Sequence, residues 1–337
     1  MWVWTGFLLM ILAFLALDLG VFHRRAHAVG IREAFVWTTV WVVLAMGFTV
    51  AIYFMYGHHW LGVGLEVGHE LSGRQAAEQF LTGYIIEKSL SLDNIFVIAL
   101  IFSYFRIPAA FQHRVLFWGI LGALLMRGGM IAAGAALLQR FDWVAYIFGL
   151  FLLATAVKML IVRHDNLEPE KNVLVRLARR FMTVSDRLDG ERFFTRVDGR
   201  RAITPLFLVL LLVESTDVLF AVDSVPAIFA VTRDPFLVFT SNVFAILGLR
   251  SLYFALAGAM SRFRYLKMSL VFVLAFVGVK MLLSHHHAIP TIVSLAFIVG
   301  ILAVGIVASL IGAHRDTAEL VSPLEMREKE RASGDIE

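Results

Sequence analysis

Six side chains that offer oxygen ligands lie in stretches otherwise apolar enough to span a membrane: Glu87, Asp93, Asn94, Glu214, Asp217 and Asp223. A charge at the bilayer centre costs at least about 2.5 to 3.5 kcal/mol on insertion scales, so an acid at that depth indicates a functional site. Carboxylate and amide oxygens are hard ligands that suit Mn²⁺, Mg²⁺ or Ca²⁺. We therefore predict one cation site with two halves, from residues 84–102 and 213–227.

Four further residues could support this site, and each has a second interpretation. Arg127 and Arg250 either pair with the acids and substitute for the cation, or act structurally by neutralising a buried acid pair. Asp18 is either an acid of the inner vestibule or an interfacial residue. Asn242 is either a further oxygen ligand or a partner in an interhelical hydrogen bond.

The composition predicts an integral membrane protein that is not an enzyme. Of the 337 residues, 59% are hydrophobic and 17% charged, and the mean hydropathy is +0.79, far from the range of soluble domains. There is no cysteine, which excludes disulfides and thiolate ligands. No dinucleotide fingerprint, P-loop, nucleophile elbow or zinc-protease pair occurs in a credible context, so we expect no cofactor. An intramembrane hydrolase is the minor alternative.

Apolar runs of about 20 residues predict an all-α protein of about nine transmembrane helices. The first lacks the basic start and cleavage pattern of a signal peptide, so we expect it to be retained. The predicted ranges are 2–22, 34–56, 80–103, 111–138, 143–163, 203–231, 236–258, 264–284 and 289–312.

The distribution of Lys and Arg predicts the orientation in the membrane. Odd-numbered connections and the C-terminal tail are rich in both, whereas even-numbered connections hold only Arg74, Arg140 and Arg233. By the positive-inside rule the N-terminus lies outside and the C-terminus in the cytoplasm, across a bacterial inner membrane. Topology also explains the net charge of +4, so we expect a lipid bilayer and no nucleic acid as partner. A homo-oligomer stays open.

An internal duplication relates predicted helices 3–5 to helices 6–8. Aligning Asp93 with Asp217 also brings Arg127 against Arg250, and it matches VKML at 157–160 with VKML at 279–282. Each repeat crosses the membrane three times, so the two repeats start on opposite sides of the membrane and have opposite orientations. Inverted repeats of this kind place substrate near the bilayer midplane, where their acids meet.

Straight helices would not bring all the acids together. On an ideal helix Asp223 points away from Glu214, and Asp93 points about 120° from Glu87 and Asn94. Pro226 removes a backbone hydrogen bond, and nearby serines offer competing ones. We therefore expect helix 203–231, and also helix 80–103, to be interrupted near the acids. If helix 203–231 is continuous, Asp223 becomes an outer-gate or structural acid.

The chain divides into six segments around this duplication. The connection before the second repeat contains 172–182, which has helical periodicity and a basic face; it is either an interfacial helix on anionic lipid or a regulatory element. A hairpin is expected around Asp198 and Gly199. The segments are an N-terminal two-helix part (1–79), the first repeat (80–163), a basic cytoplasmic connection (164–202), the second repeat (203–284), the last helix (285–314) and a charged tail (315–337).

Three stretches carry a family resemblance: LDLGVFHR, EKSLSLDNIFVI and ESTDVLFAVDSVPAIFAVTRDPFLVFTSNVFAILGLRSLYF. They resemble the TerC family of bacterial membrane proteins, in particular its Alx branch, over residues 17–283. The resemblance implies a nine-helix inner-membrane protein that exports Mn²⁺ from the cytoplasm. The acidic motif residues of the family fall here on Glu87, Asp93, Glu214, Asp217 and Asp223.

The sequence thus favours a divalent-cation exporter, with Mn²⁺ as the expected ion and alternating access at a midplane carboxylate site. Ca²⁺ stays open as the transported ion, because it accepts the same ligands. The alternative from another class is a membrane protein that binds metal or acts as a scaffold, for example in metal loading or tellurium resistance, without transport of its own.

Overall fold

The computed structural model describes residues 2–20, 30–65, 71–161, 172–185, 187–197, 199–256, 265–284 and 289–334, with only the backbone for 17–20 and 313–334. Most of these residues are helical. The helices are α1 (Trp2–Gly20), α2 (Ile31–Gly57), the short η1 (Trp60–Gly62), α3 (Gly73–Tyr104), α4 (Ala109–Arg140), α5 (Val144–Ile161), α6 (Val173–Phe181), α7 (Pro205–Phe229), α8 (Pro235–Leu247), α9 (Leu249–Leu256), α10 (Leu266–Leu283) and α11 (Thr291–Gly334).

Within the described ranges, seven helical segments are long and apolar enough to cross a membrane. They are α2, α4, α5, α7, α8 together with α9, α10, and α11 as far as Gly312. Two of the predicted spans are not among these seven. Helix α1 is an apolar stretch of shorter length, and α3 carries three charged residues, Glu87, Lys88 and Asp93, in its interior. The all-helical membrane class is therefore confirmed, whereas the count of nine spans stays a prediction.

The helix packing is symmetric when α3, α4 and α5 are exchanged with α7, α8 and α10. Helix α3 packs on α8, and correspondingly α4 packs on α7. The members of each matched pair also contact one another: α3 with α7, α4 with α8, and α5 with α10. The last pair touches through its backbones, because a Cβ on Gly149 or Gly278 would lie 3.1 or 3.0 Å from the carbonyl oxygen of the other glycine. A duplicated fold is expected to pack in this way, although the inversion itself stays a prediction.

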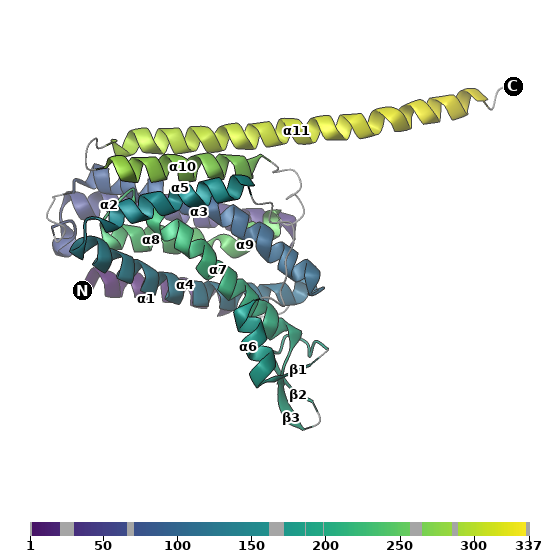
Figure 1. The fold of residues 1–337 in the computed structure, drawn as a ribbon, viewed down its shortest axis with the longest axis horizontal. Helices are drawn as coiled ribbons and strands as arrows, with labels where there is room; N and C mark the ends of the chain where they lie inside the picture. Colours follow the sequence, from purple (N-terminus) through teal and green to yellow (C-terminus); the bar gives the residue numbers. More distant parts are fainter. Residues whose placement is uncertain are drawn as a thin grey trace.

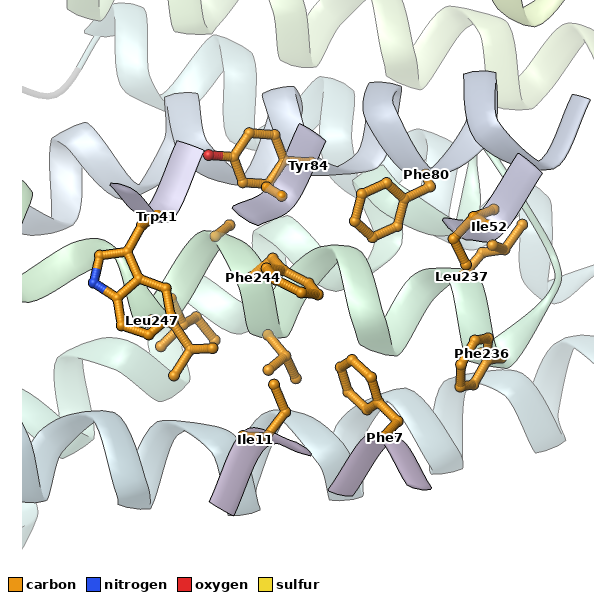
Figure 2. Close-up of a cluster of buried hydrophobic side chains, with 14 of the residues drawn as sticks. Phe7, Ile11, Trp41, Ile52, Phe80, Tyr84, Phe236, Leu237, Phe244 and Leu247 are labelled. Carbon is orange, nitrogen blue, oxygen red and sulfur yellow. The ribbon is translucent and has the colours of Figure 1, made fainter. Parts of the chain in front are cut away.

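Helix α8 lies at the centre of the bundle, and almost all of its residues are buried. In Figure 2, Phe244 of α8 stands among aromatic side chains from α1 and α3, including Phe7 and Phe80. The ring of Phe244 lies 4.7 Å from that of Phe48 on α2. This packing fixes the position of α8. It therefore also fixes Asn242, which precedes Phe244 by two residues on the same buried helix.

The expected interruption of the helix that carries three of the acids is wrong. Helix α7 is continuous from Pro205 to Phe229 with Pro226 inside it, and α3 is continuous as well. Pro226 lies in the last turn of α7, where a missing amide disturbs little of the helix. The hydroxyls of Ser89 and Ser215 donate back to Ile85 O and Leu212 O, at 2.6 and 2.9 Å, which leaves the backbone hydrogen bonds intact.

The bundle does contain a break, but at Gly248, between α8 and α9. The ammonium of Lys88 donates to Ala245 O near the end of α8, at 3.3 Å. A Cβ on Gly248 would lie 2.6 Å from Lys88 Nζ. A cation at a helix C-terminus is favourable, so the glycine provides the space in which Lys88 stabilises the end of α8.

The connection between the repeats forms a small module beside the start of α7. Within its described residues, strands β1 (Thr183–Val184), β2 (Phe194–Val197) and β3 (Arg200–Ile203) form a sheet in the order β1-β3-β2. Strands β2 and β3 are antiparallel, which confirms the predicted hairpin; Asp198 itself lies outside the described residues. Figure 1 shows α6 and the sheet projecting from the helix bundle, while α5, α10 and α11 form successive layers on its other side.

Candidate functional site

A buried arginine on α4 connects the two stretches that carry the acids. Arg127 is only 2% exposed. Its Nη1 donates to Glu87 Oε1 of α3, forming an ion pair. Its Nε and Nη2 donate to Asp217 of α7, at 3.2 and 2.9 Å. One guanidinium therefore neutralises a carboxylate from each predicted half of the site, in the bidentate geometry that arginine prefers.

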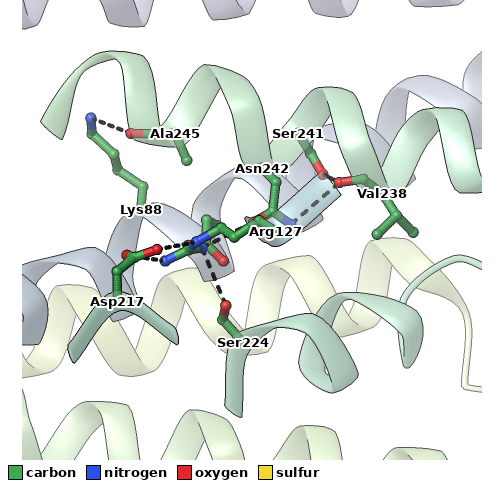
Figure 3. A network of polar contacts seen from close by, with 9 residues as sticks. Lys88, Arg127, Asp217, Ser224, Val238, Ser241, Asn242 and Ala245 are labelled. Atoms are coloured by element: carbon green, nitrogen blue, oxygen red, sulfur yellow. Dashed lines mark hydrogen bonds and ion pairs between the residues drawn. The ribbon is translucent and has the colours of Figure 1, made fainter. Parts of the chain in front are cut away.

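Two neutral side chains complete the surroundings of this guanidinium. Nη1 of Arg127 also donates to Asn242 Oδ1 of α8, at 3.0 Å, and to Ser224 Oγ of α7, at 3.3 Å. Asn242 is held by its own bond to Val238 O, at 3.3 Å. Figure 3 shows Arg127 reaching into a space bounded by Asp217, Ser224 and Asn242. Four helices thus meet at one cation, far from either end of α4.

Glycines on α4 allow α7 to come close enough for these contacts. A Cβ on Gly119 would meet Val213 at 3.3 Å, and a Cβ on Gly134 would meet the ring of Phe229 at 2.8 Å. Between them, a Cβ on Gly122 would collide with the carboxylate of Glu214. Glu214 therefore lies against the backbone of α4, about one and a half turns of that helix before Arg127.

Several buried oxygens accept no hydrogen bond from the residues that the structure describes, and three of them belong to predicted ligands: Glu87 Oε2, Asn94 Oδ1 and Glu214 Oε2. Buried polar atoms are nearly always satisfied, so such atoms need an explanation. All three are hard oxygens with unused lone pairs, the kind of group that a divalent cation binds. Even so, no three acid or imidazole side chains of the described ranges lie together as a preformed metal cluster.

Two cavities adjoin the acids, and Asn94 lines both of them. The smaller has a volume of about 20 Å³ and is lined by Asp217 and Thr216 among mostly apolar residues, which leaves room for about one water-sized particle. The larger, of about 620 Å³, is lined by Asp93 and Asp223. Asn94 therefore lies between a confined space at Asp217 and a roomy one at the other two acids.

The large cavity holds a mixed set of charges among apolar walls. Asp223 accepts a hydrogen bond from Thr155 Oγ1 of α5, at 2.9 Å. Lys158 of α5 and Lys267 of α10 also line it. Because α7 is a straight helix, its acids at positions 217 and 223 project about 120° apart. Asp223 accordingly faces a different space from Asp217.

The structure therefore divides the predicted ligands into groups. Glu87, Asp217 and Asn242 contact Arg127, whereas Asp93 and Asp223 line the large cavity. Arg250 is buried in α9, and the side chain of Asp18 lies outside the described residues.

Two residues of the site went unnoticed in the sequence: Thr155 and Gly122. A hydroxyl within an apolar helix marks Thr155, although Thr side chains there commonly bond their own helix. Gly122 lies opposite Glu214, which is a tertiary relationship that no sequence spacing shows.

Comparison with known proteins places the chain among membrane proteins. The family model described as "Integral membrane protein TerC family" matches residues 72–317. An uncharacterized membrane protein of Myxococcus xanthus is 51% identical, over 95% of this chain and 96% of its own length. The Escherichia coli K12 protein named "Putative membrane-bound redox modulator Alx" is 48% identical, over 89% and 91%. A Rickettsia bellii membrane protein is 39% identical, over 91% and 97%. No solved structure matches.

Proposed function

The chain belongs to the TerC family of integral membrane proteins, and from this premise we propose that it exports a divalent metal cation, Mn²⁺, from the cytoplasm. The observation that carries the proposal is the pairing of one buried guanidinium with Glu87 and Asp217, acids from two matched helices. Carboxylates that are held together in a membrane interior by a movable cationic side chain can exchange that partner for a metal ion. Such an exchange is the basis of a transport site.

Charge balance supports a divalent rather than a monovalent cargo. Arg127 pairs with two carboxylates, Glu87 and Asp217. When the guanidinium moves away and both acids are ionised, as metal ligands must be, they carry two negative charges, which one divalent cation balances. Asn94 Oδ1 and the orphan oxygens of the two glutamates supply further hard ligands.

The two cavities suggest the route of the ion. We propose that the cation first meets Asp93 and Asp223 in the large cavity, then passes Asn94 to reach Asp217. Asp223 thus belongs to the entrance in this proposal, and not to the outer gate or structural role expected for it in a continuous helix, because it lines the same cavity as Asp93. Arg127 moves off the acids as the ion arrives and returns when it leaves, while the matched helix sets rock against each other. No residue needs to form a covalent bond in this cycle, in keeping with a transporter rather than an enzyme.

A flux measurement tests this function directly. The protein is reconstituted in proteoliposomes and Mn²⁺ movement is followed in the parent and in Asp217→Asn. We expect the variant to lose at least about 90% of the flux, because a metal carboxylate ligand and the bidentate partner of Arg127 disappear together. Asp142→Asn is the matched control, since that acid is 79% exposed and the substitution is the same. Unchanged flux in Asp217→Asn would remove Asp217 from the site.

Binding without transport is the second candidate. The relative named "Putative membrane-bound redox modulator Alx" favours it, because that name describes no transport. The chain has no cysteine, so a thiol relay of its own is excluded, and any redox effect would come through the metal that it binds or moves. This candidate predicts Mn²⁺ binding by the purified protein with no flux.

Two further measurements test the remaining alternatives. Competition by Ca²⁺ in the flux assay decides between Mn²⁺ and Ca²⁺ as the transported ion. Substrate turnover that is abolished by neutralising the acids would favour a hydrolase instead.

The orientation belongs to the same proposal. We infer nine spans in a bacterial inner membrane, with the N-terminus outside and the C-terminus in the cytoplasm. Because the chain has no cysteine, single cysteines placed in each connection can be labelled from one side of the membrane. Labelling of the 164–202 connection and of the tail from the cytoplasm only is the expected result.

A further inference from the structure

Helix α6 presents three chemically different faces. Val175 is buried against α7 and the residues around it, and Ala178 packs in the same cluster. A second face carries Val173, Leu177 and Phe181, at intervals of four positions, and a third carries Arg176, Arg179 and Arg180. The helix is therefore fixed to the protein by one side and leaves an apolar side and a basic side uncovered.

The apolar face is unusually exposed for side chains of this kind. Val173, Leu177 and Phe181 have exposed fractions of 73%, 50% and 74%. They form one stripe along the helix, because residues four apart lie above one another. A contiguous apolar stripe bordered by polar residues marks an interaction site. Since α6 already packs on α7 through its other side, this stripe is available to something outside the described chain.

The neighbouring charges identify the chemistry of that partner. Helices with Lys or Arg on the polar face and Leu or Phe on the other lie in the membrane interface, with the apolar face in the acyl boundary. Basic residues near anionic lipid each add attraction to the surface. The adjoining sheet adds exposed arginines, at Arg196, Arg200 and Arg201.

The position of α6 keeps it near the bilayer. Asn172 caps the helix by accepting from the amides of Leu174 and Val175, at 3.0 and 3.2 Å. The same side chain donates to Ser215 Oγ of α7, at 2.7 Å, and α7 is one of the helices that are long and apolar enough to cross a membrane. Figure 1 shows α6 and the sheet standing out from the bundle, and the three stripe residues remain at least half exposed within the described part of the chain.

We propose that α6 is a docking surface for the anionic lipid surface of the protein's own membrane. Val173, Leu177 and Phe181 enter the acyl boundary, and Arg176, Arg179 and Arg180 contact lipid phosphates. Bonded through Asn172 to Ser215, the docked helix braces α7 beside Glu214 and Asp217. The proposal concerns the binding surface and holds whether or not the protein transports Mn²⁺.

A spin label tests the docking. Since the chain has no cysteine, Leu177→Cys gives a unique labelling site on the stripe. The full-length labelled protein is reconstituted in vesicles of phosphatidylcholine, alone or with about one third phosphatidylglycerol, and collisions of the label with oxygen and with a polar nickel complex are measured. In anionic vesicles we expect a label accessible to oxygen and protected from nickel, reverting toward water at high salt.

Two triple variants separate charge from packing. With Arg176, Arg179 and Arg180 all changed to Gln, the ratio of protected to exposed label in anionic vesicles should fall at least about tenfold, since each arginine adds to the attraction. With the same three changed to Lys, the ratio should stay close to the parent, which also shows that substitution there does not unfold the protein.

Two results would overturn the docking proposal. One is a label equally protected in both kinds of vesicle, which would remove anionic lipid as the partner. The other is dipolar broadening between labels in all lipids, which would show that a second copy of the chain covers the stripe.

Discussion

The acids of this protein lie in two surroundings that differ in almost every physical respect. Glu87 and Asp217 are enclosed and tied to the guanidinium of Arg127 by direct ion pairs. Asp93 and Asp223 instead line a cavity of about 620 Å³, and Asp223 accepts a hydrogen bond from a threonine. Arg127 neutralises the first set, whereas the second set lines a cavity that also holds Lys158 and Lys267.

This difference suggests a division of labour between acids of the same two helices. An acid in a roomy cavity can attract a cation while the cation keeps part of its hydration shell. An acid inside the bundle can bind the ion only after the ion loses water and Arg127 moves away from the acid. Protein ligands must then replace the water around the ion, and the ion must replace the guanidinium beside the acid. The predictions below test whether the two sets act as an entry site and a transport site.

The largest effect is expected from removing the guanidinium, in Arg127→Ala. Two carboxylates would then stay buried without a partner, which costs about 3 to 5 kcal/mol. We expect a large drop in the thermal midpoint of the protein in detergent. We also expect Mn²⁺ to restore much of it, because the ion can take the place of the lost cation.

Arg127→Lys is the matched control for that experiment. It keeps the positive charge but loses the bidentate geometry, so its midpoint should fall less and respond less to Mn²⁺. If Arg127→Ala is destabilised and Mn²⁺ does not shift its midpoint more than that of the parent, the ion pair is a packing feature and the acids do not form a cation site.

The next effect separates Asp217 from Asp223. In flux assays Asp217→Asn should lower the maximal rate by about 100-fold, since a ligand of the transport site is gone. Asp223→Asn should raise the half-saturating Mn²⁺ concentration by about tenfold and leave the maximal rate nearly unchanged, as expected when only initial binding is weakened. Equal losses of maximal rate in both variants would show a single site, and the distinction between the two sets would fail.

Much of this arrangement could be predicted from the sequence. The helix positions follow from hydropathy, and the high cost of intramembrane charge predicts Glu87 and Asp217 as members of one site, which the structure brings to the same arginine. Contact of Arg127 with the acids belongs to both of its interpretations and is observed, while the choice between a substitute for the cation and a structural role stays a prediction. These features depend on local composition and on the energetic cost of burying charge. Both can be judged from the sequence of a single membrane segment.

The partition of the acids could not be predicted, because it depends on how neighbouring helices lie. The expectation that Asp223 joins the others required a break in α7. The hydroxyl of Ser215 bonds to its own helix instead, and Pro226 comes too late in α7 to break it. The repeat also made Arg127 and Arg250 look equivalent, whereas Arg250 follows the break at Gly248, which has no counterpart in the continuous α4.

A smaller effect is expected from a substitution that only moves one carboxylate. The β-carbon of Gly122→Ala would take the space of the Glu214 carboxylate, which is the flexible end of its side chain and can turn away. Replacing a mid-helix glycine by alanine adds about 0.5 to 1 kcal/mol of stability, so the midpoint should hold or rise. Mn²⁺ flux should nevertheless fall by roughly five- to tenfold if Glu214 is a ligand.

Gly129→Ala on the same helix is its control, because nothing lies within 4 Å of a β-carbon there. It should gain the same helix stability and keep its flux. A loss of flux in both variants would trace the effect to α4 itself rather than to Glu214.

The smallest effect is expected at the edge of the large cavity, in Thr155→Val. This change keeps the shape of the side chain and removes the hydroxyl that donates to Asp223. One such hydrogen bond contributes about 1 kcal/mol, so the half-saturating Mn²⁺ concentration should change by about two- to fivefold, without loss of maximal rate. Thr155→Ser keeps the hydroxyl and should resemble the parent. If Thr155→Val instead lowers the maximal rate as Asp217→Asn does, then Asp223 takes part in the transport step, and the large cavity is an extension of the arginine-paired site rather than its entrance.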